Sequence, residues 1–231
     1  KGEQPDNEDE EAGNPSSLRG CVFRSESEKP GSQKQKGSER CLDTGNDAVQ
    51  YWTPDGKGIV IASPTRGTHA YFAPLYVVPL DGSVPYPLPM DAGATGMIKQ
   101  DGSVIAYNRV VPTYWRHGYK GNATGNIYVA KLNTKEITQL TNPDHKNFKT
   151  ATNDVYPMWG ADGRIYLSSE RDGVFNIWSI DADGSNPKQV TAYKTFGVQF
   201  PTISPDGRTI VYEQEFDLWT LKVPNGRPQK L

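Results

Sequence analysis

A short turn motif that recurs along the chain constrains the fold more than any other feature of the sequence. Thr-Pro-Asp-Gly at residues 53–56 is followed by an apolar run, and Asp-Gly returns at 101–102, 162–163 and 206–207. The copies lie 46, 61 and 44 residues apart, the period of a four-stranded propeller blade. Proline before the Asp presets φ for a turn, and glycine adopts the positive φ that a tight hairpin needs. The repeat therefore predicts hairpins at regular intervals.

The residues between these turns have the pattern of strands. Runs that alternate or are β-branched follow each Asp-Gly, and these are typical of strands with one face in a blade core. The runs cover residues 58–62, 104–107, 164–167 and 209–212, and further strands are expected at 126–130, 139–141, 176–180 and 189–191. No segment from residue 50 onward has a helical period. We predict an all-β chain of β-propeller blades, four of them visible, at about 51–90, 97–141, 157–191 and 201–231.

The number of blades predicts an open arc. Closed propellers usually contain four to eight blades, and repeats of this style occur mostly in six- and seven-bladed rings. An open arc exposes two apolar blade faces and unpaired strand edges. Because the chain starts with Lys1 and its last strand reaches the terminus, we expect it to be a piece of a larger protein.

Residues 1–43 differ from the rest of the chain. They are rich in Glu, Lys, Ser and Gly and show no strand or helix period, so they contain too little apolar surface to offset the entropy of ordering. We expect a disordered tail or a foreign leader here, and the partial propeller over residues 44–231. Cys21 and Cys41 both lie in this tail, match no zinc spacing and are interpreted as free thiols.

The search for chemistry is mostly negative. The sequence has no Gly-x-Ser-x-Gly elbow and no glycine-rich phosphate loop, and His69, His117 and His145 lack the spacing of metal ligands. Residues 181–186 resemble a calcium loop, but they fall where each blade has a hairpin and lack the closing Glu. The near-neutral body argues against nucleic acid as a partner, and no apolar run approaches the length of a membrane span. We expect no catalytic residue, no metal and no cofactor.

One insertion, residues 109–125, breaks the blade period. Pro112 excludes a central strand, and glycines at 118, 121 and 125 allow tight turns. Two interpretations remain open: the aromatic residues pack on the propeller surface, or the loop contacts a substrate or partner. The candidate contact residues are Tyr114, Trp115, Arg116, His117, Tyr119 and Lys120. A second irregular stretch, residues 142–156, is polar and predicts a long surface loop.

The insertion also carries a family resemblance. Residues 114–128 resemble a Trp-basic-x-Tyr-x-Gly-Gly-x-x-Gly-x-Ile-Trp-like pattern in the first, six-bladed propeller of tricorn-type serine peptidases. Residues 164–173 and 176–179 resemble the strand and turn that follow in that family. The Pro-Asp-Gly motifs alone are less specific, since TolB and prolyl-oligopeptidase propellers share them. The resemblance covers about residues 44–231.

The resemblance implies a function for the longer protein. Tricorn-type enzymes trim oligopeptides with a C-terminal serine peptidase region, and their propellers are thought to filter access to it. It implies a noncatalytic propeller that gates or channels oligopeptides, with other domains or subunits of the parent as partners, in a homo-oligomer. The family places a basic pair for the substrate C-terminus just ahead of Val49, but residues 42–47 contain no arginine. The alternative is a stand-alone TolB-like scaffold in the bacterial envelope; the compartment is left open.

Overall fold

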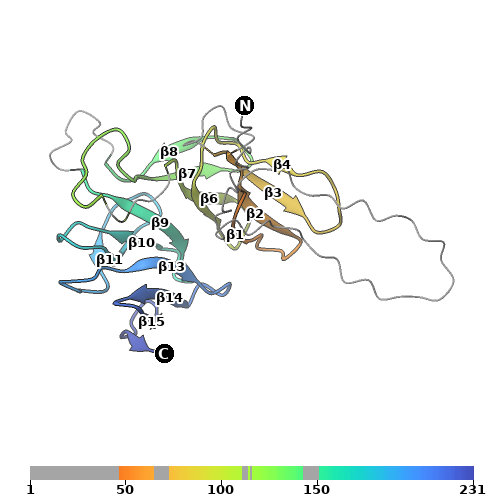
Figure 1. Ribbon diagram of the computed structural model, residues 1–231. Coiled ribbons are helices and arrows are strands. Elements are labelled where there is room, and N and C mark those ends of the chain that lie inside the picture. Colours follow the sequence, from red (N-terminus) through yellow and green to blue (C-terminus); the bar gives the residue numbers. More distant parts are fainter. Residues whose placement is uncertain (1–46, 65–72, 111–113, 115, 143–150) are drawn as a thin grey trace, which may run out of the picture.

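The chain forms four antiparallel sheets of four strands each (Figure 1). The computed structural model describes residues 47–64, 73–110, 114, 116–142 and 151–231. Within these ranges there is no α-helix. The first two sheets contain β1 (Ala48–Trp52), β2 (Gly58–Ala62), β3 (Leu75–Pro79) and β4 (Tyr86–Pro87), then β5 (Thr95–Ile98), β6 (Val104–Asn108), β7 (Ile127–Lys131) and β8 (Ile137–Gln139). The last two contain β9 (Asp154–Trp159), β10 (Ile165–Ser169), β11 (Asn176–Ile180) and β12 (Lys188–Gln189), then β13 (Gln199–Ile203), β14 (Thr209–Gln214), β15 (Asp217–Lys222) and β16 (Gln229–Lys230). The predicted all-β fold and its four blades are confirmed.

The repeated turn motif closes the hairpin between the first two strands of each blade. Gly56, Gly102, Gly163 and Gly207 all have φ between 67° and 80°, as their place in tight turns requires. In the first blade the Thr53 hydroxyl donates to Asp55 Oδ1 at 2.6 Å, and the Gly58 N–H donates back to Thr53 Oγ1 at 2.9 Å. The motif therefore contains its own hydrogen-bond partners, which explains why so few residues specify the turn.

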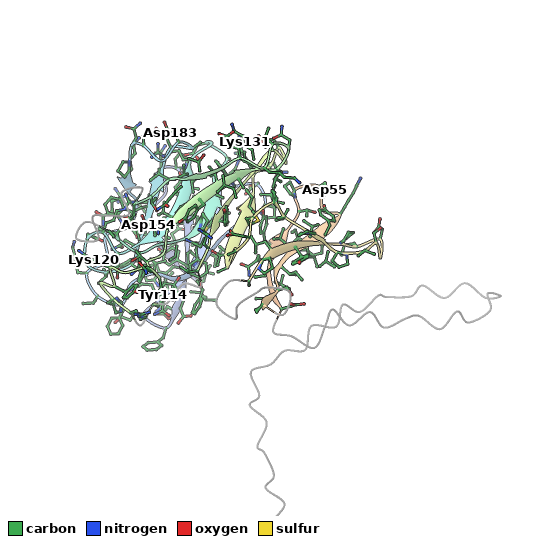
Figure 2. All side chains as sticks on the ribbon, turned by 90° about the horizontal axis from the view of Figure 1, so that it is seen from above. Asp55, Tyr114, Lys120, Lys131, Asp154 and Asp183 are labelled. Atoms are coloured by element: carbon green, nitrogen blue, oxygen red, sulfur yellow. The ribbon has the colours of Figure 1, made fainter. Side chains whose placement is uncertain are left out.

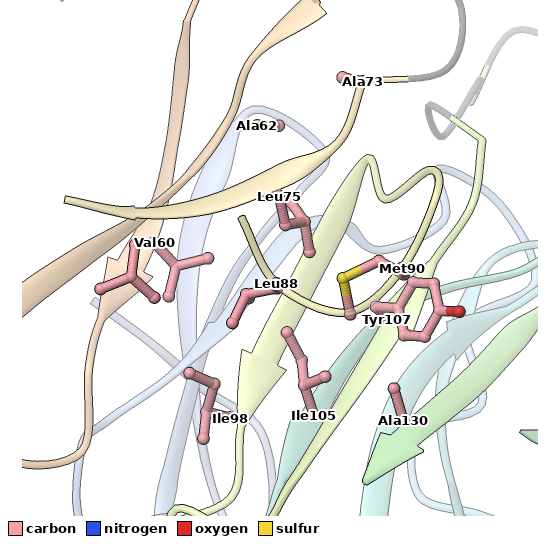
Figure 3. Close-up of a cluster of buried hydrophobic side chains, with 11 residues drawn as sticks. Val60, Ala62, Ala73, Leu75, Leu88, Met90, Ile98, Ile105, Tyr107 and Ala130 are labelled. Carbon is pink, nitrogen blue, oxygen red and sulfur yellow. The ribbon is translucent and has the colours of Figure 1, made fainter. Parts of the chain in front are cut away.

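The blades stack face to face and bury three apolar layers. The layer between blades 1 and 2 includes Val60, Leu75, Ile105 and Tyr107 (Figure 3). A second layer joins blades 2 and 3, and a third joins blades 3 and 4. The first strands of neighbouring blades, β1, β5, β9 and β13, contact one another in succession. They are therefore the innermost strands, which line the axis of a propeller.

The hairpins divide the molecule into two ends. Asp55, Lys131 and Asp183 mark the end that carries the Asp-Gly hairpins, which we call the turn end (Figure 2). Tyr114 and Lys120 lie at the opposite end (Figure 2), which we call the insertion end. The β6–β7, β10–β11 and β14–β15 connections all belong to the insertion end, because strand direction alternates within each blade.

The first and last blades have apolar residues on the surface. Val49 and Trp52 of β1 and Leu218 of β15 are exposed, in agreement with the expected open arc. The six-bladed ring stays a prediction. The predicted tail, residues 1–43, lies outside the described residues, and so do Cys21 and Cys41.

One prediction about the fold was wrong. Residues 142–156 do not form a surface loop throughout, because β9 begins at Asp154. Asn153, Asp154 and Val155 are buried. The polar side chains of Asn153 and Asp154 are hydrogen-bonded to neighbouring segments, so the polarity of this stretch does not indicate exposure.

Candidate functional site

Tyr114 anchors the insertion in a cluster of aromatic rings. Its ring stacks on Tyr156 at 5.7 Å between centroids and meets Phe175 and Phe200 edge-on at 5.0 and 5.4 Å. The residue is only 9% exposed, and its hydroxyl accepts the Phe200 N–H at 2.9 Å. Edge-to-face and offset pairs of this kind stabilise packing beyond the area they bury. Burial raises the pKa of Tyr114 well above its ordinary value, so the phenol remains protonated. We call these four residues the aromatic cluster.

Strained backbone places two members of the aromatic cluster. Tyr156 and Phe200 have φ of 55° and 46°, a conformation that aromatic residues rarely adopt. Each lies where the register of its strand shifts, in β9 and in β13. Each also precedes a proline, which has no N–H to offer the ladder. Such bulges redirect side chains, and here both rings turn toward Tyr114.

The Glu170 carboxylate holds the turn of the insertion. Both of its oxygens accept the Gly118 N–H, at 3.1 and 3.0 Å, and Oε1 also accepts from Asn153 Nδ2 at 2.6 Å. Gly118 has φ of 64°, so the predicted tight turn is present there. The Glu170 side chain is 6% exposed, and its Oε2 lies 3.9 Å from His117 Nδ1. A buried carboxylate from blade 3 thus fixes the position of a loop from blade 2.

The cationic residues of the insertion lie on the surface. Arg116, His117 and Lys120 are exposed, and Tyr119 is half-buried. The Arg116 guanidinium lies 3.9 Å from the centre of the Tyr119 ring, a cation–π contact that orients it without removing it from solvent. The predicted site therefore separates into a buried anchor, Tyr114, and an exposed cationic surface. Trp115 lies outside the described residues.

A polar network joins blades 2 and 3 beneath the insertion. Asn108 Nδ2 donates to the carbonyls of Asn126 and Asp154 at 2.8 and 2.9 Å. Its Oδ1 accepts from the Tyr156 N–H at 2.9 Å. Asp154 is fully buried and pairs with Arg171 at 2.9 Å. Because the side chains of Asn108 and Asp154 are both fully buried and hydrogen-bonded, the network fixes the register of the two blades.

Exposed phenylalanines lie at the same end of the molecule. Phe196, Phe200 and Phe216, which we call the phenylalanine rim, are 56%, 58% and 89% exposed. The rings of Phe196 and Phe216 lie 6.5 Å apart, and all three residues have positive φ. Phe216 belongs to the β14–β15 hairpin and Phe200 to the innermost strand β13, so the rim lies at the insertion end, with Phe200 nearest the propeller axis. Strained, exposed aromatic residues are typical of contact surfaces.

The described part of the site combines apolar rings with exposed cations. Among the described residues, no group of three or more His, Cys, Asp and Glu side chains could hold a metal ion. His117, the one histidine among the described residues, faces the Glu170 carboxylate. In the same residues, no helix is long and apolar enough to cross a membrane. Apolar rings beside exposed cations can contact apolar side chains and carboxylates.

Sequence reasoning missed Glu170, Asn153 and the phenylalanine rim. Glu170 is 52 residues from Gly118, and nothing in its local sequence indicates a role as an acceptor. The Tyr-Pro and Phe-Pro pairs at residues 156–157 and 200–201 were the available signal for the bulges, since proline inside a strand marks an irregularity.

Comparison with known proteins identifies a family and several relatives. The model of the family "Tricorn protease N-terminal beta propeller domain" matches residues 38–227. A tricorn protease homolog of Saccharolobus solfataricus is 24% identical over 174 residues, which are 75% of this chain and 15% of that protein. An uncharacterized protein of Agrobacterium fabrum, Atu1656, is 26% identical over 203 residues, covering 70% of this chain and 63% of its own. The chain thus spans less than two thirds of either relative.

Two solved structures share the fold. A tricorn protease structure aligns with 80% of this chain, and the aligned part is 17% of the tricorn protease chain. The TM-score is 0.65 and the sequence identity is 21%. TolB from Acinetobacter baumannii aligns with 81% of this chain, and the aligned part is 43% of the TolB chain. The TM-score is 0.59 and the sequence identity is 19%. At these identities the likeness concerns the arrangement of blades.

Proposed function

Because the chain belongs to the tricorn protease N-terminal β-propeller domain family, we propose that it is the noncatalytic propeller portion of a tricorn-like, oligopeptide-trimming serine peptidase. In this proposal its insertion end contacts peptides on their way to or from a catalytic region elsewhere in the parent protein. Other domains or subunits of that parent are its partners, and the parent is a homo-oligomer.

One observation carries the proposal: the insertion is fixed to blade 3 in a way that leaves its cations exposed, at the same end of the molecule as the phenylalanine rim. Tyr114 and Glu170 hold the loop, so Arg116 and His117 occupy defined positions. Phe200 extends this surface to the innermost strand β13, beside the propeller axis. A peptide that enters there meets apolar rings for its side chains and positive charge for a carboxylate.

The proposal is tested by peptide binding to the chain. The probe is a fluorescein-labelled apolar hexapeptide with a free C-terminal carboxylate, measured by fluorescence anisotropy. The double variant Arg116→Ala/Lys120→Ala should bind it about tenfold more weakly, as expected for the loss of a charge-assisted contact. Its melting temperature should be unchanged, because both side chains are exposed. The amidated peptide should bind the unaltered chain more weakly than the free acid.

The matched control removes two lysines at the turn end. Lys57→Ala/Lys131→Ala makes the same change in net charge as the test variant and should leave peptide affinity unaltered. Lys57 follows Asp55 in the β1–β2 turn, and Figure 2 shows Asp55 and Lys131 away from Tyr114 and Lys120. Equal affinity in both double variants would remove the contact role. In the parent peptidase, the Arg116→Ala/Lys120→Ala variant should also slow oligopeptide trimming or weaken subunit assembly.

A stand-alone TolB-like interaction scaffold is the second candidate. It is favoured by the likeness in fold to TolB, since the chain matches 43% of TolB from Acinetobacter baumannii but 17% of the tricorn protease structure. The complete reading frame separates the candidates. A PDZ-like domain and peptidase region downstream would support the first, whereas an end after two further blades would support the second.

A further inference from the structure

The last hairpins of blades 2, 3 and 4 each contain an exposed asparagine. These residues are Asn133 between β7 and β8, Asn186 between β11 and β12, and Asn225 between β15 and β16. All three hairpins belong to the turn end, because strand direction alternates within each blade. An asparagine side chain can react with its own backbone, and the attacking atom is the nitrogen of the next residue. The residue that follows each asparagine therefore decides whether it can react.

The three turns differ at this next residue. Pro187 follows Asn186 and has no N–H to lose. Thr134 follows Asn133, and its β-branched side chain crowds the nitrogen that would attack. Gly226 follows Asn225 and has no side chain to shield its nitrogen. Of these three turns, the one in blade 4 is therefore open to the reaction.

The fold itself requires glycine after Asn225. A Cβ at position 226 would overlap the Lys222 carbonyl oxygen and lie 2.9 Å from Lys222 Cβ. The Gly226 N–H donates to the same carbonyl oxygen at 2.6 Å, which closes the turn. Within the part of the chain that the structure describes, the Asn225 side chain makes no hydrogen bond. The turn thus places an unrestrained carboxamide directly before an unshielded backbone nitrogen.

We propose that Asn225 is a site of spontaneous deamidation through a cyclic imide formed with Gly226. The Gly226 nitrogen attacks Asn225 Cγ, so an N–Cγ bond forms and the bond from Cγ to the side-chain nitrogen breaks. That nitrogen leaves as ammonia and carries away the proton that the Gly226 nitrogen loses. Water then opens the imide at either carbonyl, which yields aspartate or isoaspartate. The nucleophile and the carbon belong to neighbouring residues, so the first step is intramolecular.

The hairpin controls the rate and bears the consequence. The hydrogen bond from Gly226 to Lys222 must open before the nitrogen can attack. The loop is exposed and β16 has two residues, so this opening is local and frequent. Either product makes the net charge one unit more negative than −2. Isoaspartate also adds one carbon to the backbone of the turn, which disturbs the pairing of Thr220 with Gln229. The proposal is independent of the peptide contact at the insertion end.

Mass spectrometry of the chain, aged in mildly alkaline buffer and digested with trypsin, tests the proposal. The peptide of residues 223–230 should gain one dalton, the difference between an amide and a carboxylic acid. It should separate into two chromatographic peaks, one for aspartate and one for isoaspartate. The gain should be faster at higher pH, because the Gly226 nitrogen must lose its proton. The peptides that contain Asn133 and Asn186 are controls in the same sample and should keep their mass.

The matched variant is Asn225→Gln, which keeps the carboxamide but adds a methylene, so the same attack would have to close a larger ring. It should fold as the unaltered chain does, since residue 225 is exposed, and its peptide should keep its mass. A synthetic peptide of residues 223–230 shows the reaction without the fold. The proposal would be overturned by an unchanged mass at Asn225 while the synthetic peptide reacts, by an equal gain in Asn225→Gln, or by equal gains at Asn133 and Asn225.

Discussion

Glu170 is the residue on which the position of the insertion depends most directly. It accepts hydrogen bonds from Gly118 and Asn153 while almost fully buried. A glutamine has the same shape and its oxygen could still accept from both donors, but its NH₂ group would face the Gly118 N–H where Oε2 now accepts, and the negative charge that strengthens these bonds would be lost. We expect Glu170→Gln to lower the free energy of unfolding by about 1–3 kcal/mol, measured by urea denaturation.

The control for Glu170 is Glu136, an exposed residue paired with Lys131 at 2.7 Å. Exposed ion pairs contribute little, so Glu136→Gln should change stability by less than about 0.5 kcal/mol. An equally small effect of Glu170→Gln would show that the insertion is held by other contacts.

In the turn at Asp101-Gly102, a neighbouring serine hydroxyl lowers the pKa of the aspartate. The side chain of Ser103, its N–H and Lys99 together lower the pKa of Asp101 to about 2. Because the folded pKa lies below the unfolded value of about 3.9, this carboxylate stabilises the fold above that value and loses its contribution as the pH falls toward 2. We expect Ser103→Ala to raise the Asp101 pKa toward its ordinary value in a ¹³C NMR titration. Ser185→Ala, which acts on Asp183, should leave Asp101 unaltered.

At the scale of elements, the insertion joins blade 2 to blades 3 and 4. Tyr114 contacts Tyr156 of β9, Phe175 before β11 and Phe200 of β13. Removing its ring would leave a cavity among three aromatic side chains. We expect Tyr114→Ala to destabilise the chain by about 3–5 kcal/mol, the cost of deleting a buried aromatic ring.

Tyr114→Phe isolates the hydroxyl from the ring. It keeps the packing but leaves the Phe200 N–H without its acceptor, so we expect a loss of about 1 kcal/mol. Both values come from urea denaturation followed by tryptophan fluorescence. A loss in Tyr114→Ala no greater than in Tyr114→Phe would indicate that the ring contributes little to joining the blades.

At the scale of the whole molecule, we propose that the four blades provide a contact surface for peptides. We expect the purified chain to hydrolyse no peptide, since His117, the one histidine among the described residues, is paired with Glu170 rather than with a serine. Fluorogenic tripeptides provide the assay, with a preparation from cells that lack the expression plasmid as the control for contaminating peptidases. Turnover that persists after repurification would contradict this expectation.

The sequence by itself determined the elements and their repeat. Proline and glycine at the turns act through φ, and alternation acts through the two faces of a strand; both are local, so they are visible in short stretches of sequence. The strands β2, β6, β10, β11 and β14 therefore lie close to their predicted positions. The insertion was also visible, because it interrupts a regular period.

Only the tertiary structure decided which side chains of the insertion are buried, which are exposed and what they contact. Tyr114 is buried because three rings from later blades surround it, whereas Arg116 is exposed and its guanidinium lies over the Tyr119 ring. Glu170 reaches Gly118 across 52 residues, and Asn153 and Asp154 are buried although their segment is polar. Each of these outcomes depends on which blades stack together. Such contacts join residues far apart in the chain, so the local patterns of the sequence do not encode them.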